Sequence, residues 1–221
     1  MAARPKGICS YCGEEIAKQS TVKHLHTCAK RVAAIDAATG KTERLFYLRA
    51  ECEFNKGLFL DLEVRGSATL NDLDRYLRAI WLECCGHMSE FAYKAWEDTI
   101  DSSRKVESVF KTRKQITHLY DMGSTSETTL RVLAERKDAP TTERPLALMV
   151  RNKMPEASCD ECGKPARWMC NECLAEEGKY VALCDDCLEP HGHLTDYPPT
   201  LLINSPRMGM CAYEGPAEAP Y

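Results

Sequence analysis

The sequence predicts an α+β domain flanked by two cysteine-rich segments, and three observations lead to this fold class. Apolar and polar residues alternate in several short stretches between residues 43 and 155, which is typical of strands. Residues 69–83 of that region follow the spacing of an amphipathic helix instead. Eight of the thirteen cysteines form Cys-x-x-Cys pairs, and these pairs all lie outside the central region. Strands arranged around one helix are expected to give an α+β fold.

The composition restricts the compartment in which such a protein works. No apolar run approaches the roughly 20 residues that cross a bilayer, and the first residues lack the apolar core of a secretory signal. We therefore expect a cytoplasmic protein that does not bind membranes. In a reducing compartment, thirteen cysteines indicate metal binding rather than a disulfide framework.

The first cysteine-rich segment, residues 1–36, is predicted to be a zinc knuckle with ligands Cys9, Cys12, His24 and Cys28. On a helix, His24 and Cys28 are four residues apart and share a face. His26 is the competing ligand, but it lies two residues before Cys28 and would face elsewhere. The spacing resembles that of small C2HC knuckles, some of which bind ubiquitin and others nucleic acid.

The central segment, residues 43–155, is the one long enough to form a large core. The stretches ERLFYLRAECEF and GLFLDLEVRG flank Asn55-Lys56-Gly57 and are predicted to form a hairpin. Thr69 and Asp72 have the spacing of a capping box at the start of the predicted helix. Further strands are expected in EFAYKAW, KQITHLYDM, TTLRVLAER and PLALMV.

The second cysteine-rich segment, residues 156–197, contains eight possible metal ligands, enough for two tetrahedral zinc ions. Neighbouring pairs can share a metal, or the pairs can interleave as in the cross-brace of RING and B-box fingers. The spacing resembles a B-box, and we favour the interleaved arrangement because a seven-residue loop containing Pro165 and Trp168 suits a finger whose two pairs diverge. With the knuckle, this gives about three structural zinc ions per chain. The eight ligands are Cys159, Cys162, Cys170, Cys173, Cys184, Cys187, His191 and His193.

The central segment resembles the Ri-plasmid ORF-3-like family, also known as passenger proteins of bacterial insertion elements. The resemblance covers residues 43–150 and the end of the chain, and it departs from the family pattern at Met122, Ser124 and Thr128-Thr129. It implies a bacterial protein whose compact domain has a mixed sheet and a packed helix. It also implies that residues 156–197 are an insertion, and that residues 198–221 supply a closing strand and tail. The matching stretches are YLR, TLNDL, WLECCGHMSEF, YDMGSTSETTLRV and NSPRMGMCAYEGP.

An enzymatic alternative would use Cys84 or Cys85 with His87 and Asp121 as a nucleophilic site. No recognisable nucleophile turn surrounds these residues, and no glycine-rich phosphate loop is present in the sequence. We therefore expect a protein that is not an enzyme and does not act on a small molecule.

The charge distribution leaves two kinds of partner open. Residues 1–35 carry six basic and two acidic residues, and residues 102–115 carry five basic residues and one acidic residue. Residues 156–197 carry ten acidic and three basic residues. The sequence therefore predicts a zinc-binding recognition or adaptor protein whose partner is a protein or a nucleic acid. In the alternative, it is a nucleic-acid-binding accessory protein of a mobile element, with the N-terminal finger contacting phosphate.

Overall fold

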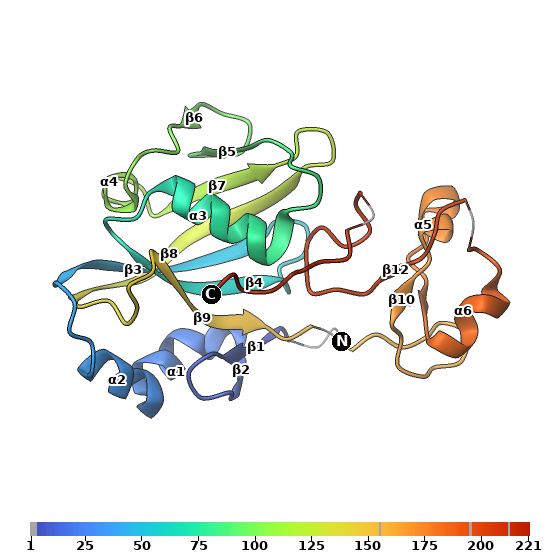
Figure 1. The fold of residues 1–221 in the computed structure, drawn as a ribbon, viewed down its shortest axis with the longest axis horizontal. Coiled ribbons are helices and arrows are strands. Elements are labelled where there is room, and N and C mark those ends of the chain that lie inside the picture. Colours follow the sequence, from blue (N-terminus) through green and yellow to red (C-terminus); the bar gives the residue numbers. More distant parts are fainter. Residues whose placement is uncertain (1–3, 155, 195, 212) are drawn as a thin grey trace.

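The computed structural model describes residues 4–154, 156–194, 196–211 and 213–221. Residues 1–3, 155, 195 and 212, which the predicted segments include, lie outside the described residues. Figure 1 shows a large body built on one sheet and a smaller C-terminal module joined to it by two stretches of chain. Among the described residues, no helix combines the length and apolar content that a membrane crossing requires.

The large body contains a nine-stranded sheet with the order β2-β1-β9-β4-β3-β8-β7-β5-β6. Every strand pairing among the described residues is antiparallel, so the α+β class is correct and the expected mixed sheet is wrong. Four hairpins join sequential strands, and none of these connections is the long crossover that a parallel pair requires. The strands are β1 Lys6–Cys9, β2 Glu15–Ala17, β3 Glu43–Cys52, β4 Phe59–Arg65, β5 Ser89–Ala92, β6 Thr99–Ile100, β7 Gln115–Tyr120, β8 Ser126–Asp138 and β9 Leu146–Asn152.

The two strongest local predictions are confirmed. Strands β3 and β4 form the expected hairpin, in which the Asn55 side chain accepts a hydrogen bond from the Gly57 amide at 2.9 Å. Helix α3, Leu70–Leu77, begins with a capping box between Thr69 and Asp72 and continues into a π-helical segment η2, Arg78–Leu82. This helical segment packs on one face of the sheet, and the apolar spacing of its sequence explains why. The helical residues buried in this core are Leu70, Leu73, Tyr76, Leu77, Ile80, Trp81 and Leu82.

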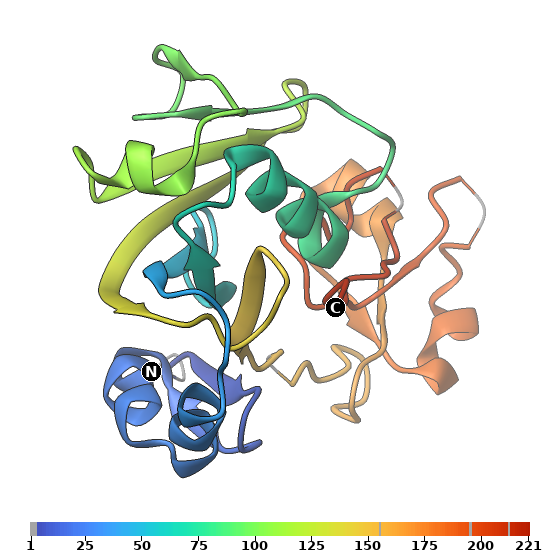
Figure 2. The same ribbon diagram turned by 60° about the vertical axis from the view of Figure 1, so that its left-hand side comes forward.

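Part of the opposite face of the sheet, over β3, β4 and β9, is covered by the N-terminal segment (Figure 2), which contains helices α1, Thr21–Thr27, and α2, Ala29–Asp36. Leu25 of α1 packs with Tyr47, Phe59 and Met149 of the sheet. Strand β1 also pairs with β9, so the edge of the large sheet passes into this segment. Residues 1–36 are therefore not the separate unit that the sequence predicted. The sequence of the short strand β1, KGIC, contains no signal that predicts its pairing with β9, which lies more than 140 residues later.

Buried polar contacts fix α1 against the sheet. Arg49 donates to the Asp61 carboxylate at 2.7 and 2.9 Å and to the Thr21 hydroxyl at 2.7 Å. The Tyr47 hydroxyl donates to Asp61 at 2.8 Å. Asp61 is fully buried, so these bonds compensate the charge that burial would otherwise disfavour.

The C-terminal module contains helices α5, Asn171–Glu177, and α6, Asp185–His191, with a three-stranded sheet of order β11-β10-β12. Its strands are β10 Trp168–Met169, β11 Ala182–Leu183 and β12 Thr200–Leu201. Among the described residues of 198–221, the strand β12 pairs with β10 and none joins the large sheet, so the expected closing strand is wrong. The remaining tail returns along the α3 side of the large body, where the Ser205 hydroxyl donates to the Trp81 carbonyl at 2.6 Å.

Candidate metal centres

The first cluster of possible metal ligands lies in the N-terminal segment. Cys9 ends β1, Cys12 lies in the following turn, His24 lies in α1 and Cys28 directly follows that helix. Their ligand atoms all lie within 4.8 Å of one another, and His24 Nε2 is 3.5 Å from Cys12 Sγ. His26 is outside the cluster and is solvent-exposed. The helical spacing of His24 and Cys28 thus positions these two donors together.

The C-terminal module contains two more clusters, in the interleaved order. Cys159, Cys162, Cys184 and Cys187 form one group, and Cys170, Cys173, His191 and His193 form the other. Within each group all ligand atoms lie within 4.8 Å of one another.

Two helix starts shape these groups. Cys170 and Cys184 are the residues that precede α5 and α6, and the Cys170 sulfur accepts a hydrogen bond from the Cys173 amide at 3.4 Å. Both helices end at a glycine in the left-handed conformation, Gly178 and Gly192. The Gly192 turn places His191 and His193 next to each other, with ring centroids 4.7 Å apart.

The separations between donor atoms match the edges of a zinc tetrahedron. Zn–S and Zn–N bonds of about 2.3 and 2.0–2.1 Å imply S···S edges of about 3.8 Å and S···N edges of about 3.6 Å. Cys162 Sγ and Cys184 Sγ are 3.6 Å apart, well beyond the roughly 2.05 Å of a disulfide. Cys173 Sγ lies 3.3 Å from both His191 Nε2 and His193 Nδ1. These clusters can hold metal ions, and their geometry is compatible with zinc.

Each histidine in these three clusters also has a carboxylate next to its other ring nitrogen. Glu14 lies 3.5 Å from His24 Nδ1, Glu161 lies 3.3 Å from His191 Nδ1 and Glu172 lies 3.7 Å from His193 Nε2. A carboxylate in this position fixes the tautomer and orientation of a metal-ligating imidazole. Sequence reasoning did not identify these three glutamates, because their roles depend on the folded positions of the histidines.

Neighbouring thiols in the four-cysteine group oppose one another's ionisation. Burial raises the pKa of Cys159, but amide donors, including those of Cys184 and Cys162, outweigh it and bring the pKa to about 6. Contacts with the neighbouring Cys162 and Cys184 sulfurs raise the pKa of Cys187 to about 12. A divalent cation would remove this opposition, because it stabilises all four thiolates at once.

The residues of the enzymatic alternative also lie close together. His87 Nε2 is 3.6 Å from Asp121 Oδ2, and a metal-ligand cluster unites Cys84, Cys85 and His87 with Cys211. Sequence reasoning did not identify Cys211, an isolated cysteine in the tail that no spacing pattern connects to the Cys-Cys-Gly-His stretch.

The basic stretch at residues 102–115 is partly engaged within the fold. Its helix α4, Val106–Phe110, buries Val106, Val109 and Phe110 in the large core. Lys114 forms an ion pair with Glu135 at 2.5 Å, and Arg104 donates to the Tyr93 hydroxyl at 3.1 Å.

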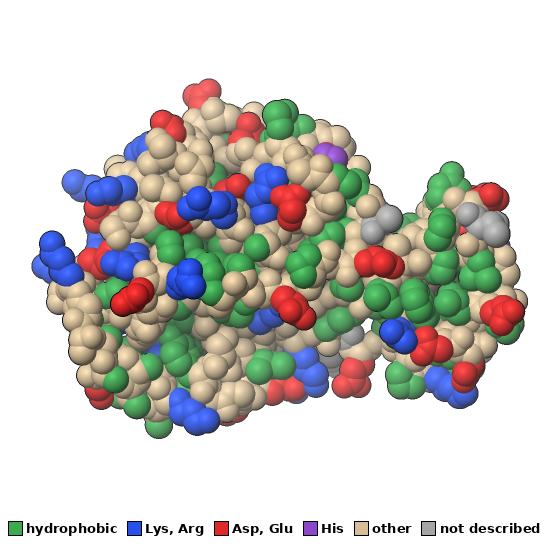
Figure 3. Space-filling view, viewed as in Figure 1, with side chains coloured by type: hydrophobic (Ala, Val, Ile, Leu, Met, Phe, Trp, Pro, Cys, Tyr) green, Lys and Arg blue, Asp and Glu red, His purple; other side chains and the backbone are tan. Residues whose placement is uncertain are grey.

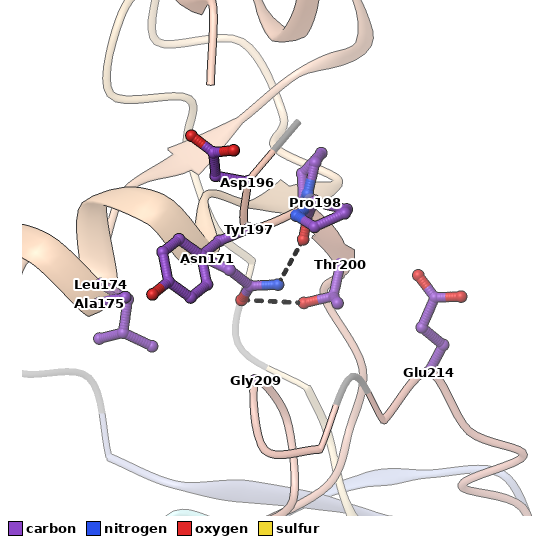
Figure 4. Close-up of a pocket in the computed structure, with 10 residues that line it drawn as sticks. Asn171, Leu174, Ala175, Asp196, Tyr197, Pro198, Thr200, Gly209 and Glu214 are labelled. Carbon is purple, nitrogen blue, oxygen red and sulfur yellow. Dashed lines mark hydrogen bonds between the residues drawn. The ribbon is translucent and has the colours of Figure 1, made fainter. Parts of the chain in front are cut away.

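A largely apolar groove of about 530 Å³ lies where the tail passes the C-terminal module (Figure 4). The Asn171 amide donates to the Pro198 carbonyl at 2.6 Å and holds one wall in place. Asp196 and Glu214 also line the groove. Figure 3 shows apolar side chains gathered over this module, next to the hollow that separates it from the large body. The apolar lining comes from Leu174, Ala175, Tyr197, Pro198 and Pro199.

Comparison with known proteins gives little further information. No family model matches the chain, and no curated protein matches it. A solved structure similar to part of the chain is described as the crystal structure of a protein of unknown function, MM3350, from Methanosarcina mazei Go1. The two are 15% identical with a TM-score of 0.42, over 56% of this chain and 76% of that one. The resemblance to the Ri-plasmid ORF-3-like family therefore stays a prediction.

Proposed function

We propose that the chain is a zinc-binding recognition protein in which three zinc ions are structural. The observation that carries this proposal is the common construction of the three clusters. Each contains four cysteine or histidine donors, and each histidine has a glutamate beside its second ring nitrogen. Four protein ligands leave no open position at a tetrahedral zinc, so these sites stabilise the fold and do not activate water.

The C-terminal module is the proposed recognition surface, and its partner is a protein segment with an apolar side chain between basic residues. Leu174 and Tyr197 expose 37% and 49% of their surface beside the groove. Asp196 and Glu214 line the same groove, in a module with ten acidic and three basic residues. A zinc ion bound by four thiolates adds further negative charge. This charge favours a basic segment and opposes nucleic-acid phosphate.

Nucleic-acid binding through residues 102–115 is the second candidate, supported by the excess of basic residues there. The Lys114–Glu135 ion pair and the Arg104–Tyr93 contact already use part of this charge. Phosphate contact predicts an affinity that falls steeply with salt, so labelled duplex DNA titrated at two salt concentrations tests this candidate directly.

Two measurements test the main proposal. Elemental analysis of the purified chain is expected to give at least three zinc ions, and one or none would refute it. An array of peptides carrying a central Leu or Phe with basic or acidic flanks then probes the groove. We expect binding of the basic set only.

Matched variants locate the binding. Leu174→Glu introduces a charge into the groove and is expected to abolish peptide binding, whereas Phe54→Ser removes an exposed apolar side chain outside the groove lining and is expected to preserve it. Equal binding by both variants would contradict recognition through the groove. Equal binding of acidic and basic peptides would contradict the charge argument.

A further inference from the structure

The segment that follows η2 and the C-terminal tail together contain a fourth set of possible metal ligands. Cys84, Cys85, His87 and Cys211 have ligand atoms that all lie within 4.8 Å of one another. His87 Nε2 is 3.5 Å from Cys211 Sγ, the same separation as between His24 Nε2 and Cys12 Sγ in the N-terminal cluster. This distance again matches the S···N edge of about 3.6 Å in a zinc tetrahedron.

The large body fixes three of these donors. The Cys84 amide donates to the Tyr120 hydroxyl at 3.3 Å, and the Gly86 amide donates to the Glu83 carboxylate at 2.5 Å. Gly86 has a φ of +72°, which allows the tight turn that brings His87 back towards the cysteines. The ring of His87 packs edge-on against Tyr120, with centroids 5.8 Å apart.

The fourth donor, Cys211, comes from the tail, and the buried Arg207 positions this part of the chain. The Arg207 Nη2 group donates to Asp121 at 2.9 Å and lies 3.4 Å from the sulfurs of both Cys84 and Cys211. Arg207 is fully buried, so it requires negative charge nearby. Asp121 supplies one negative charge, and a zinc ion with three thiolates and one imidazole, whose net charge is −1, would place a second negative charge beside the same guanidinium.

Two simpler interpretations account for fewer of these residues. A disulfide would use two of the three sulfurs and leave the third thiol and His87 unexplained. A nucleophilic site would use one sulfur, yet His87 lies as close to Cys211 as to Asp121, at 3.5 and 3.6 Å. Arg207 faces two sulfurs together, which fits a shared cation better than a single nucleophile.

We propose that Cys84, Cys85, His87 and Cys211 bind a fourth zinc ion, which fastens the C-terminal tail to the large body. The site differs from the other three in two respects. Cys211 is more than 120 residues away in the sequence from the other three ligands, and two of the ligands, Cys85 and Cys211, are solvent-exposed, whereas the other clusters contain at most one exposed ligand, Cys162. Its ion is therefore the most accessible of the four to a chelator. The proposal does not depend on the recognition function.

This site would account for nearly every cysteine in the chain. The four clusters use twelve of the thirteen cysteines, and the remaining one, Cys52, is buried in the large core. Cys52→Ser is thus a matched control, because it removes a thiol that belongs to none of the clusters.

Zinc content measured by elemental analysis tests the proposal. The intact chain is expected to contain four zinc ions, Cys211→Ser and Cys85→Ser three, and Cys52→Ser four. A Cys211→Ser protein with the zinc content of the intact chain would overturn the fourth site. Three ions in the intact chain, none of them lost in Cys211→Ser, would overturn it and leave the other three sites standing.

Hydrogen exchange gives a second readout that does not depend on counting ions. Exchange in residues 205–211 and 213–221 is expected to rise in Cys211→Ser relative to Cys52→Ser, while exchange in β3 and β4 stays unchanged. Equal protection of the tail in both variants would refute the fastening role. If Cys211→Ser unfolds and loses every zinc ion, the zinc content of His87→Asn is measured instead. Retention of all zinc ions by His87→Asn would overturn the site.

Discussion

The large body and the C-terminal module differ in the residues that form their buried clusters. In the large body, aliphatic and aromatic side chains of α3 and η2 fill the space above the sheet, and Trp81, Leu73 and Leu77 are fully buried. In the module, four of the five residues in the buried cluster are cysteines, and Leu183 is the fifth. Burial of apolar surface can stabilise the large body, but the module has too little apolar surface to fold by burial alone.

This difference assigns separate roles to sequence pattern and to metal. Hydrophobic periodicity accounts for the fold of the large body, whereas under the proposed function the spacing of metal donors would determine the fold of the module. The N-terminal segment combines both features. It contains a cluster of metal donors, but its Leu25 also packs on the sheet and its strand β1 extends the sheet. Treatments that remove metal should therefore affect the three regions to different extents.

Removal of zinc with a strong chelator is expected to have the largest effect. Structural zinc contributes about 10–16 kcal/mol in finger peptides, so the module should unfold completely. Hydrogen exchange should show α5 and α6 losing protection while β3, β4 and α3 retain it. Loss of protection in all regions together would mean that the large body also depends on metal.

Trp81→Ala is expected to have the converse effect. Removing a large buried side chain from a packed core costs about 3–5 kcal/mol, so thermal or denaturant unfolding of the large body should shift strongly. The zinc content of the folded protein should not change, because Trp81 belongs to none of the clusters. A loss of zinc from folded Trp81→Ala would show that the core and the metal sites are not independent.

The same contrast explains which features could be predicted from the sequence. The Thr69 capping box and the Asn55-Lys56-Gly57 turn depend on residues a few positions apart, and both are present in the structure. The grouping of Cys211 with His87 depends on the path of the tail, about which local spacing contains no information. The pairing of β1 with β9, and of β12 with β10, was missed for the same reason.

Glu161→Gln tests whether the carboxylates beside the histidines support metal binding. Outer-sphere partners of this kind typically change metal affinity 10–100-fold, so zinc competition with a chromophoric chelator should show weaker binding by about that factor. Glu189→Gln, at an exposed acid of α6, removes the same charge from the module and serves as the control. Equal affinity in the two variants would limit Glu161 to a general electrostatic contribution.

Thr69→Ala is the smallest change and is confined to the large body. It removes the hydroxyl that accepts from the Asp72 amide at 3.2 Å, and loss of such a cap costs about 1 kcal/mol. Thr69→Ser keeps the hydroxyl and should retain most of the stability, so the difference between the two variants isolates the capping bond. Denaturant unfolding measures this difference on the large body. The exchange of α5 and α6 should be the same in both variants, because under the proposed function their protection depends on zinc and not on the start of α3. If α5 and α6 instead lost protection in Thr69→Ala, the two regions would be coupled through the tail, and the separation between a core held by burial and a module held by metal would fail.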